Sequence, residues 1–249
     1  MPEIIEIEQP LTDIEIRRAT VAELLVRKSQ NIKSPRLAAI STADLRLLYE
    51  LYDEVFLQGW FKNNYKGRIR FSFSRMMTKS AGKTICPKNI GKIKPEDLVV
   101  EIRIGIDFFL NYGQLSMRNT VCGLKADSGL EALMLVFEHE LCHVVEFILY
   151  HNSSCAGERF KSMSKNLFGH TESWHKLPTN RQIADKVLGF RIGDTVSFKF
   201  KDKKLTGIIY NVRKRATVLV PDSKGMFMDR SGKMYSKYYI PLRLLARVN

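Results

Sequence analysis

Apolar residues recur at helical spacing early in the chain. Between residues 41 and 61, one helical face would carry Leu45, Leu48, Tyr52, Val55 and Phe56. Ser41 or Thr42 can cap the start of this helix. The spacing in residues 1–41 is weaker, and we interpret that segment as a peripheral N-terminal helix and linker.

Strand patterns and one long helix follow. Residues 67–77 (GRIRFSFSRMM) alternate, and residues 97–109 (DLVVEIRIGIDFF) are rich in β-branched side chains, so both predict strands of a short mixed sheet. Residues 128–150 contain neither glycine nor proline after Gly129, and Ser128 and Glu131 have the spacing of a capping box. This segment predicts a long, mostly buried helix, and the expected fold class is α+β.

The pattern changes after Lys186. Three short alternating runs, RIGDTVSFKF, LTGIIYNV and RATVLVP, are separated by turn residues and predict the strands of a small all-β barrel. We therefore divide the chain into an N-terminal helix and linker (1–41), a main domain (42–180) and a barrel (190–249).

Charge is concentrated in the barrel. The chain has a formal net charge of +14, and residues 190–249 hold 14 Lys and Arg against 4 Asp and Glu, which is +10 of that total. Such a surface attracts polyanions and raises their rate of encounter. Nucleic acid is therefore the leading candidate partner.

The cysteines and the apolar stretches of the sequence indicate the cellular compartment. Four scattered cysteines form no C-x-x-C pair, so they predict neither a disulfide framework nor a zinc knuckle and suit a reducing compartment. The N-terminus has no basic region followed by an apolar run, and no stretch reaches 18 uncharged apolar residues. We expect a soluble intracellular protein with no membrane partner.

The predicted long helix contains the candidate metal ligands and the candidate catalytic residue. His139 and His143 are four residues apart, so on a helix both imidazoles project from one face and can bind one zinc ion. Glu140 is placed to take a proton from a water activated by the metal and to pass it to a leaving amine. The implied reaction is hydrolysis of a peptide bond.

Residues 42 to about 178 resemble the SprT-like family of zincin metalloproteases, which includes the Spartan type. The resemblance rests on the segments LRLLYELYDEVF, RFSFSRMMTKSAGK, EIRIGIDFF, FEHELCHVVEF and AGERFKSMSKNLFGHTESWH. It implies a zincin-like domain with a small mixed sheet, and a zinc protease acting on DNA-associated or DNA-crosslinked proteins in DNA repair. It further implies a nuclear or DNA-associated location.

The resemblance also identifies a departure. The family's third zinc ligand is a histidine, and the corresponding residue here is Ala156, which cannot bind metal. Four neighbours are candidates to replace it: Cys155, Glu158, His151 and His170. For Cys155 a small half-buried residue, and for Glu158 a solvated helix charge, are the ordinary interpretations.

Other residues could support the motif. His170 matches the family and would pack near the site or orient a neighbour. Glu138 and Glu146 could orient a histidine as hydrogen-bond acceptors, although a solvated or salt-bridged surface is the ordinary expectation for each.

The barrel segment resembles SH3-like or KOW-type barrels, with Gly193-Asp194 starting a strand and Gly207 at a bend. Lysines and arginines alternate with Phe198, Phe200 and Tyr210, so we expect the aromatic rings to fill the core while the cations face phosphates. The alternative function is a catalytically impaired SprT-like protein, lacking its third ligand, that works as a nucleic-acid-binding or scaffold module.

Overall fold

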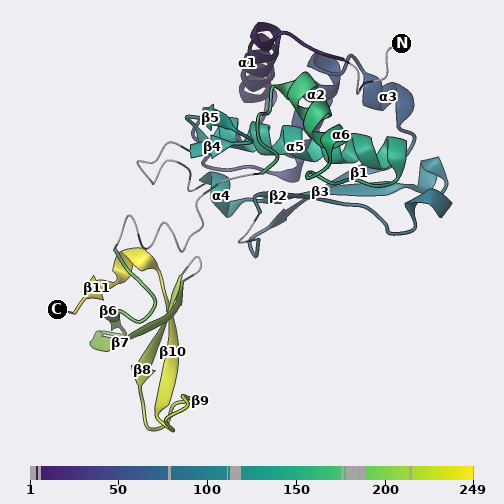
Figure 1. Ribbon diagram of the computed structural model, residues 1–249. Helices are drawn as coiled ribbons and strands as arrows, with labels where there is room; N and C mark the ends of the chain where they lie inside the picture. The colour runs from purple at the N-terminus through teal and green to yellow at the C-terminus, as the bar shows by residue number, and fades with distance from the viewer. Residues whose placement is uncertain are drawn as a thin grey trace. The chain divides into compact units, whose positions relative to one another are not determined.

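The computed structural model describes residues 4, 7–77, 80–110, 112, 119–174, 177, 185, 189–212 and 215–248. The chain forms two compact units, Met1–Leu177 and Pro178–Asn249 (Figure 1). The expected α+β class is confirmed, because helices and sheets both occur. No helix within the described ranges is long and apolar enough to cross a membrane.

The first unit contains six helices and five short strands among its described residues. Its helices are α1 Leu11–Lys28, α2 Thr42–Val55, α3 Trp60–Asn64, α4 Asp107–Leu110, α5 Gly129–Tyr150 and α6 Glu158–Phe168. Its strands are β1 Arg68–Ser74, β2 Gly82–Ile85, β3 Val99–Gly105, β4 Asn119–Val121 and β5 Leu124–Ala126. Two 3-10 turns, η2 Ile90–Lys92 and η3 Pro95–Asp97, connect β2 to β3.

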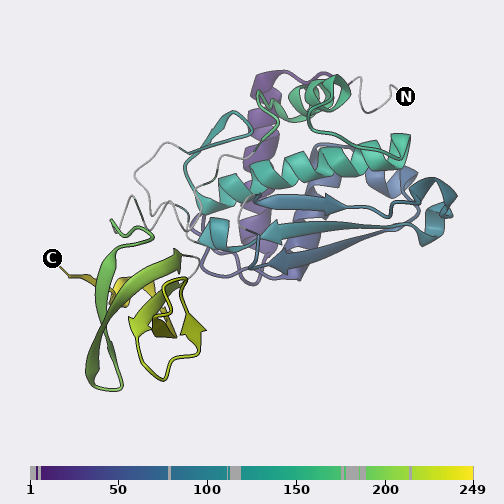
Figure 2. The same ribbon diagram turned by 60° about the horizontal axis from the view of Figure 1, so that its bottom comes forward.

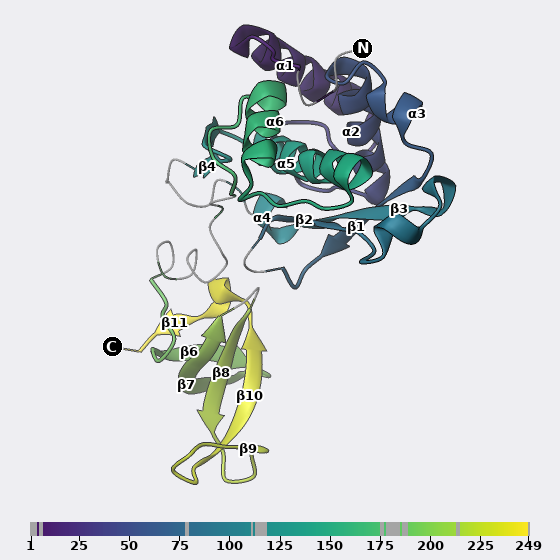
Figure 3. The same ribbon diagram turned by 45° about the vertical axis from the view of Figure 1, so that its right-hand side comes forward.

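The main sheet of this unit is mixed, as the sequence predicts. Its order is β1-β3-β2, with β1 parallel and β2 antiparallel to β3. Helix α5 lies across one face of this sheet (Figure 2). Helices α1, α2 and α6 are grouped around α5 on the same side, so α5 forms the centre of the core (Figure 3).

The N-terminal helix is part of this core rather than peripheral to it. Helix α1 buries Ile14, Val21 and Leu25, all of which belong to the same apolar cluster as α5. Helix α2 starts at a capping box in which Ser41 accepts a hydrogen bond from the Asp44 backbone and Asp44 accepts one from Ser41. Structurally, residues 1–41 therefore belong to the same compact unit as the main domain.

The second unit is a single antiparallel sheet. Its strands are β6 Thr195–Phe200, β7 Lys203–Val212, β8 Ala216–Pro221, β9 Phe227–Met228, β10 Met234–Ile240 and β11 Ala246–Arg247, with the 3-10 turn η4 Leu242–Leu244 before the last. Their order is β11-β6-β7-β8-β10-β9. A separate apolar core, which includes Val196, Phe198, Ile209 and Val218, lies within this unit.

Gly207 is required by a close approach of two strands. A Cβ at this position would lie 2.3 Å from the carbonyl oxygen of Leu219 on strand β8. Glycine therefore lets β7 and β8 pack against each other where a side chain would clash. Most of the predicted boundary between the main domain and the barrel, residues 178–184 and 186–188, lies outside the described residues.

Candidate metal centre

Helix α5 positions the His-Glu-x-x-His motif inside the protein. Ser128 caps the helix by accepting a hydrogen bond from the Glu131 backbone, as its spacing predicts. Residues from Gly129 to Glu146 are buried with few exceptions. The motif consequently lies on a helix that neighbouring elements hold on several sides.

The two histidines converge on one point. Their Nε2 atoms are 3.1 Å apart, and both rings pack on Phe160 of α6, with centroid distances of 4.7 Å for His139 and 4.5 Å for His143. A tetrahedral zinc ion with Zn–N bonds of about 2.0–2.1 Å would hold two nitrogens about 3.3 Å apart. The pair is therefore spaced to bind a single metal ion.

A hydrogen-bond chain fixes the orientation of His143. Ser153 donates its hydroxyl proton to Glu146 Oε2 at 2.6 Å, and its Oγ lies 2.5 Å from His143 Nδ1. Because the only hydroxyl proton points to the carboxylate, Oγ accepts a hydrogen bond from Nδ1–H. This tautomer leaves the lone pair of His143 on Nε2, which is the atom that faces His139.

Burial keeps the same imidazole neutral. It lowers the pKa of His143 to about 4, with the negative charge of Glu146 opposing that shift. Glu146 is itself buried and accepts a hydrogen bond from Arg159 Nε at 2.7 Å. At neutral pH, His143 is therefore in the form that binds metal.

A second group of potential ligands surrounds the other side of His139. Cys122 Sγ lies 3.9 Å from His139 Nδ1, and Cys122, His139 and His170 offer ligand atoms within 4.8 Å of one another. All three side chains are buried. The described residues thus contain two groups of His and Cys that could hold a metal ion, and His139 belongs to both.

Glu138, next to the motif, is a buried ion-pair partner. It accepts hydrogen bonds from Arg18 Nε at 2.8 Å, from the Tyr52 hydroxyl at 2.7 Å and from His170 Nε2 at 2.9 Å. Burial alone raises its pKa, but the charge of Arg18 and hydrogen bonds from His170 and Arg18 lower the pKa of Glu138 to about 2. Arg18, 120 residues away in sequence, is a residue that sequence reasoning did not identify.

Glu140 faces the sheet, and no cation among the described residues pairs with it. Its Oε2 accepts a hydrogen bond from Thr84 Oγ1 on strand β2 at 2.7 Å. Burial raises the pKa of Glu140 to about 7, an effect that the Thr84 hydrogen bonds only partly offset. A Cβ on Gly82 would lie 2.5 Å from Glu140 Oε1, so strand β2 makes room for this carboxyl group by having glycine there.

The structure separates the four candidates for a third ligand. Cys155 offers its sulfur within 4.8 Å of ligand atoms on both His139 and His143, so it joins the pair. His170 is grouped only with His139 and Cys122, whereas Glu158 is 90% exposed at its side chain and pairs with Lys161. His151 is exposed and belongs to neither metal-binding group found among the described residues.

The second unit departs from one expectation. Phe198 is in the core as predicted, but Phe200 and Tyr210 are 42% and 51% exposed. Lys237 Nζ lies 3.8 Å from the centre of the Phe227 ring and 5.7 Å from that of Tyr210. Aromatic rings and a cation therefore share an outer face of this sheet, because Tyr210 follows the buried Ile209 on β7 and so lies on the opposite face.

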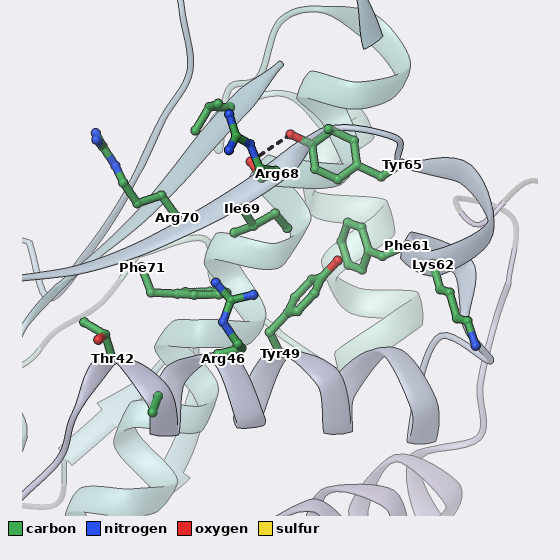
Figure 4. A pocket seen from close by; sticks show the side chains of 13 residues that line it. Thr42, Arg46, Tyr49, Phe61, Lys62, Tyr65, Arg68, Ile69, Arg70 and Phe71 are labelled. Atoms are coloured by element: carbon green, nitrogen blue, oxygen red, sulfur yellow. Dashed lines mark hydrogen bonds between the residues drawn. The ribbon is translucent and has the colours of Figure 1, made fainter. Parts of the chain in front are cut away.

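A basic pocket lies elsewhere on the first unit (Figure 4). It has a volume of about 790 Å³ and lies between α2 and β1, with Tyr49 and Phe71 among its aromatic residues. Its cations are Arg46, Lys62, Arg68 and Arg70, and the described residues that line it include no carboxylate. The pocket is therefore suited to an anion.

Comparison of the chain with protein-family models, with curated proteins and with solved structures finds no match.

Proposed function

We propose that this chain is a zinc-dependent endopeptidase of the SprT-like, zincin type that acts on proteins bound to or crosslinked with DNA. The observation that carries the proposal is the 3.1 Å separation of the two Nε2 atoms of His139 and His143, with Glu140 between them on one helix. The mixed sheet below α5, with β2 beside Glu140, is in keeping with a zincin-like domain.

The donor set suits zinc. Imidazole and thiolate are preferred zinc ligands, and buried His and Cys groups surround the motif. Zinc, when bound, acts as a Lewis acid that makes water nucleophilic near neutral pH and polarises the scissile carbonyl. His139 and His143 would hold the ion, and the Ser153–Glu146 chain would keep the His143 ring in the binding orientation.

Glu140 is the proposed general base. A carboxyl group with a pKa of about 7 exchanges protons readily near neutral pH. It would take a proton from the attacking water and deliver it to the amine that leaves. Thr84 holds Oε2 through its hydroxyl group, so Oε1 is the oxygen left for that proton transfer.

The proposed partner is nucleic acid, with DNA favoured. Residues 190–249 of the second unit carry a net charge of +10, the outer face of the sheet combines exposed Tyr210 and Tyr239 with Lys237, and we assign this unit to the SH3-like barrels. Cations on such a face would contact phosphates and exposed rings would stack on bases. The basic pocket of the first unit offers a further place for phosphates.

The experiment compares Glu140→Gln with the intact chain on a DNA-bound protein substrate. Cleavage should fall by at least about 100-fold in the variant while zinc content is unchanged, because a general base contributes that much without binding the metal. Glu158→Gln, an exposed carboxylate, is the control and should cleave normally. Cleavage that persists in Glu140→Gln contradicts the mechanism.

The second candidate is a non-catalytic nucleic-acid-binding or scaffold protein. Ala156, at the position of the family's third ligand, and the charge of the second unit favour it. Zinc per polypeptide after dialysis against trace zinc distinguishes the two. About one equivalent that is lost in His139→Ala supports the peptidase, whereas a zinc content near zero together with salt-dependent DNA binding supports the alternative.

A further inference from the structure

Ala156 and Cys155 occupy neighbouring positions in one tight turn between α5 and α6. The Gly157 backbone N–H donates to the Ser154 carbonyl oxygen at 2.9 Å, so Cys155 and Ala156 are enclosed by that turn. Ala156 is exposed, whereas Cys155 is half-buried and a free thiol. Of the two residues, only Cys155 is grouped with the histidine pair.

The turn is attached to the motif helix through one carboxylate. Glu146 accepts hydrogen bonds from the Ser153 hydroxyl at 2.6 Å, from the Ser154 backbone N–H at 3.2 Å and from Arg159 Nε at 2.7 Å. These residues flank Cys155 on both sides in sequence. The thiol is therefore held beside the imidazoles by contacts made independently of any metal.

We propose that Cys155 is the third protein ligand of the metal, forming a His139–His143–Cys155 site in place of a histidine at position 156. This inference rests on the metal site of the proposed function. The three ligand atoms lie within 4.8 Å of one another. In a tetrahedral zinc site with a Zn–S bond of about 2.3 Å, the sulfur and nitrogen ligands lie about 3.6 Å apart. The three ligand atoms would therefore have to move closer together by about 1 Å to bind one zinc ion.

Cys122, the other cysteine grouped with His139, is less suited to this role. Cys122 faces the Nδ1 side of His139, and its group does not include His143. Cys155 is therefore the cysteine that can complete the coordination of a metal bound by the two converging Nε2 atoms. Three protein ligands and one open position for water form the arrangement of a catalytic zinc site.

Cobalt(II) titration of the metal-free full-length chain tests the assignment, since a cobalt thiolate bond adds a charge-transfer absorption in the near ultraviolet. We expect one equivalent of cobalt to bind with that band. Cys155→Ala should lose the band and weaken binding by at least about 100-fold, because changes merely to residues around a ligand cost 10–100-fold. Cys155→His should bind cobalt without the band.

Cys86→Ala is the matched control, because Cys86 is also a free cysteine of intermediate exposure. It should retain both the band and the affinity, and circular dichroism should show that every variant is folded. Binding that depends on His139 but lacks the band, or a band that survives in Cys155→Ala, overturns the ligand assignment and leaves the peptidase proposal standing. Cobalt binding that is absent from the intact chain, or unchanged in His139→Ala, overturns the metal site itself.

Discussion

Two carboxyl groups buried on different faces of helix α5 have pKa values that are shifted in opposite directions. On the face toward α1 and α2, Glu138 is paired with Arg18 and also accepts a hydrogen bond from His170, and these contacts lower its pKa to about 2. On the face toward the sheet, Glu140 accepts hydrogen bonds from Thr84 and has no cationic partner among the described residues, and burial raises its pKa to about 7. The residues lie two positions apart, so the neighbouring elements and not the helix determine which one carries charge.

The largest expected effect comes from removing the cation on the α1 face. Arg18→Met should destabilise the protein by about 3–5 kcal/mol, because it leaves the charge of Glu138 buried without the guanidinium that neutralises it. Urea unfolding measures this loss. Arg27→Met, an exposed arginine of the same helix, should change stability by less than about 1 kcal/mol.

The double variant Arg18→Met with Glu138→Gln sharpens the same test. Removing both charges should recover part of the lost stability, since the penalty arises from an unpaired charge rather than from the missing pair. A double variant no more stable than Arg18→Met alone would mean that Arg18 stabilises α1 by packing and not through Glu138.

A smaller effect is expected from the hydroxyl groups. Tyr52→Phe removes a donor to an ionised carboxylate and should cost about 1.5–3 kcal/mol, whereas Thr84→Val removes a donor to a mostly protonated one at pH 6 and should cost about 1 kcal/mol. Tyr49→Phe, on the same helix as Tyr52, is the control. Equal losses for Tyr52 and Thr84 in urea unfolding would contradict the contrast between the two faces.

The smallest effect concerns a third buried carboxylate, Glu101 on the outer face of the sheet. Burial alone raises its pKa, but hydrogen bonds from Ser72, Arg103 and Arg70 lower it from 4.5 to about 2. Its contribution is therefore complete above pH 4.5 and is lost as the pH falls toward 2. Because Arg70 and Arg103 are 67% and 40% exposed at their side chains, we expect a contribution of at most about 1 kcal/mol.

Stability measured between pH 5 and pH 2 checks this prediction. Glu101→Gln should lose less stability over that range than the intact chain, and the difference between the two should shrink in 1 M salt. A difference that salt leaves unchanged would show that the arginines act on Glu101 as if they were shielded from solvent.

Patterns within a single element were readable from sequence. Alternation predicted the strands of the mixed sheet, and the Ser128–Glu131 spacing predicted the start of α5. The four-residue interval predicted that His139 and His143 share a face, which their 3.1 Å contact bears out geometrically. Each of these features depends on residues a few positions apart.

Contacts between elements that are distant in the chain could not be predicted from the sequence. Nothing in the weak apolar spacing of residues 1–41 indicates that Arg18 reaches Glu138, because burial of an ion pair depends on how α1 packs against α5. The exposure of Tyr210 depends on which face of β7 meets the core: Ile209 is buried, so its neighbour Tyr210 lies on the outer face. The choice of Cys155 over His151 or Glu158 likewise depends on the path of the chain after α5.

The contact between Arg18 and Glu138 also limits how this domain can be shortened or transplanted. A fragment that begins at Thr42 contains the whole motif and all its candidate ligands, yet it lacks the cation that neutralises the residue directly before His139. Such a fragment would retain the chemistry in its sequence and lose the electrostatic balance that lets α5 stay buried. The smallest portable form of the site therefore begins at or before Leu11, where α1 starts.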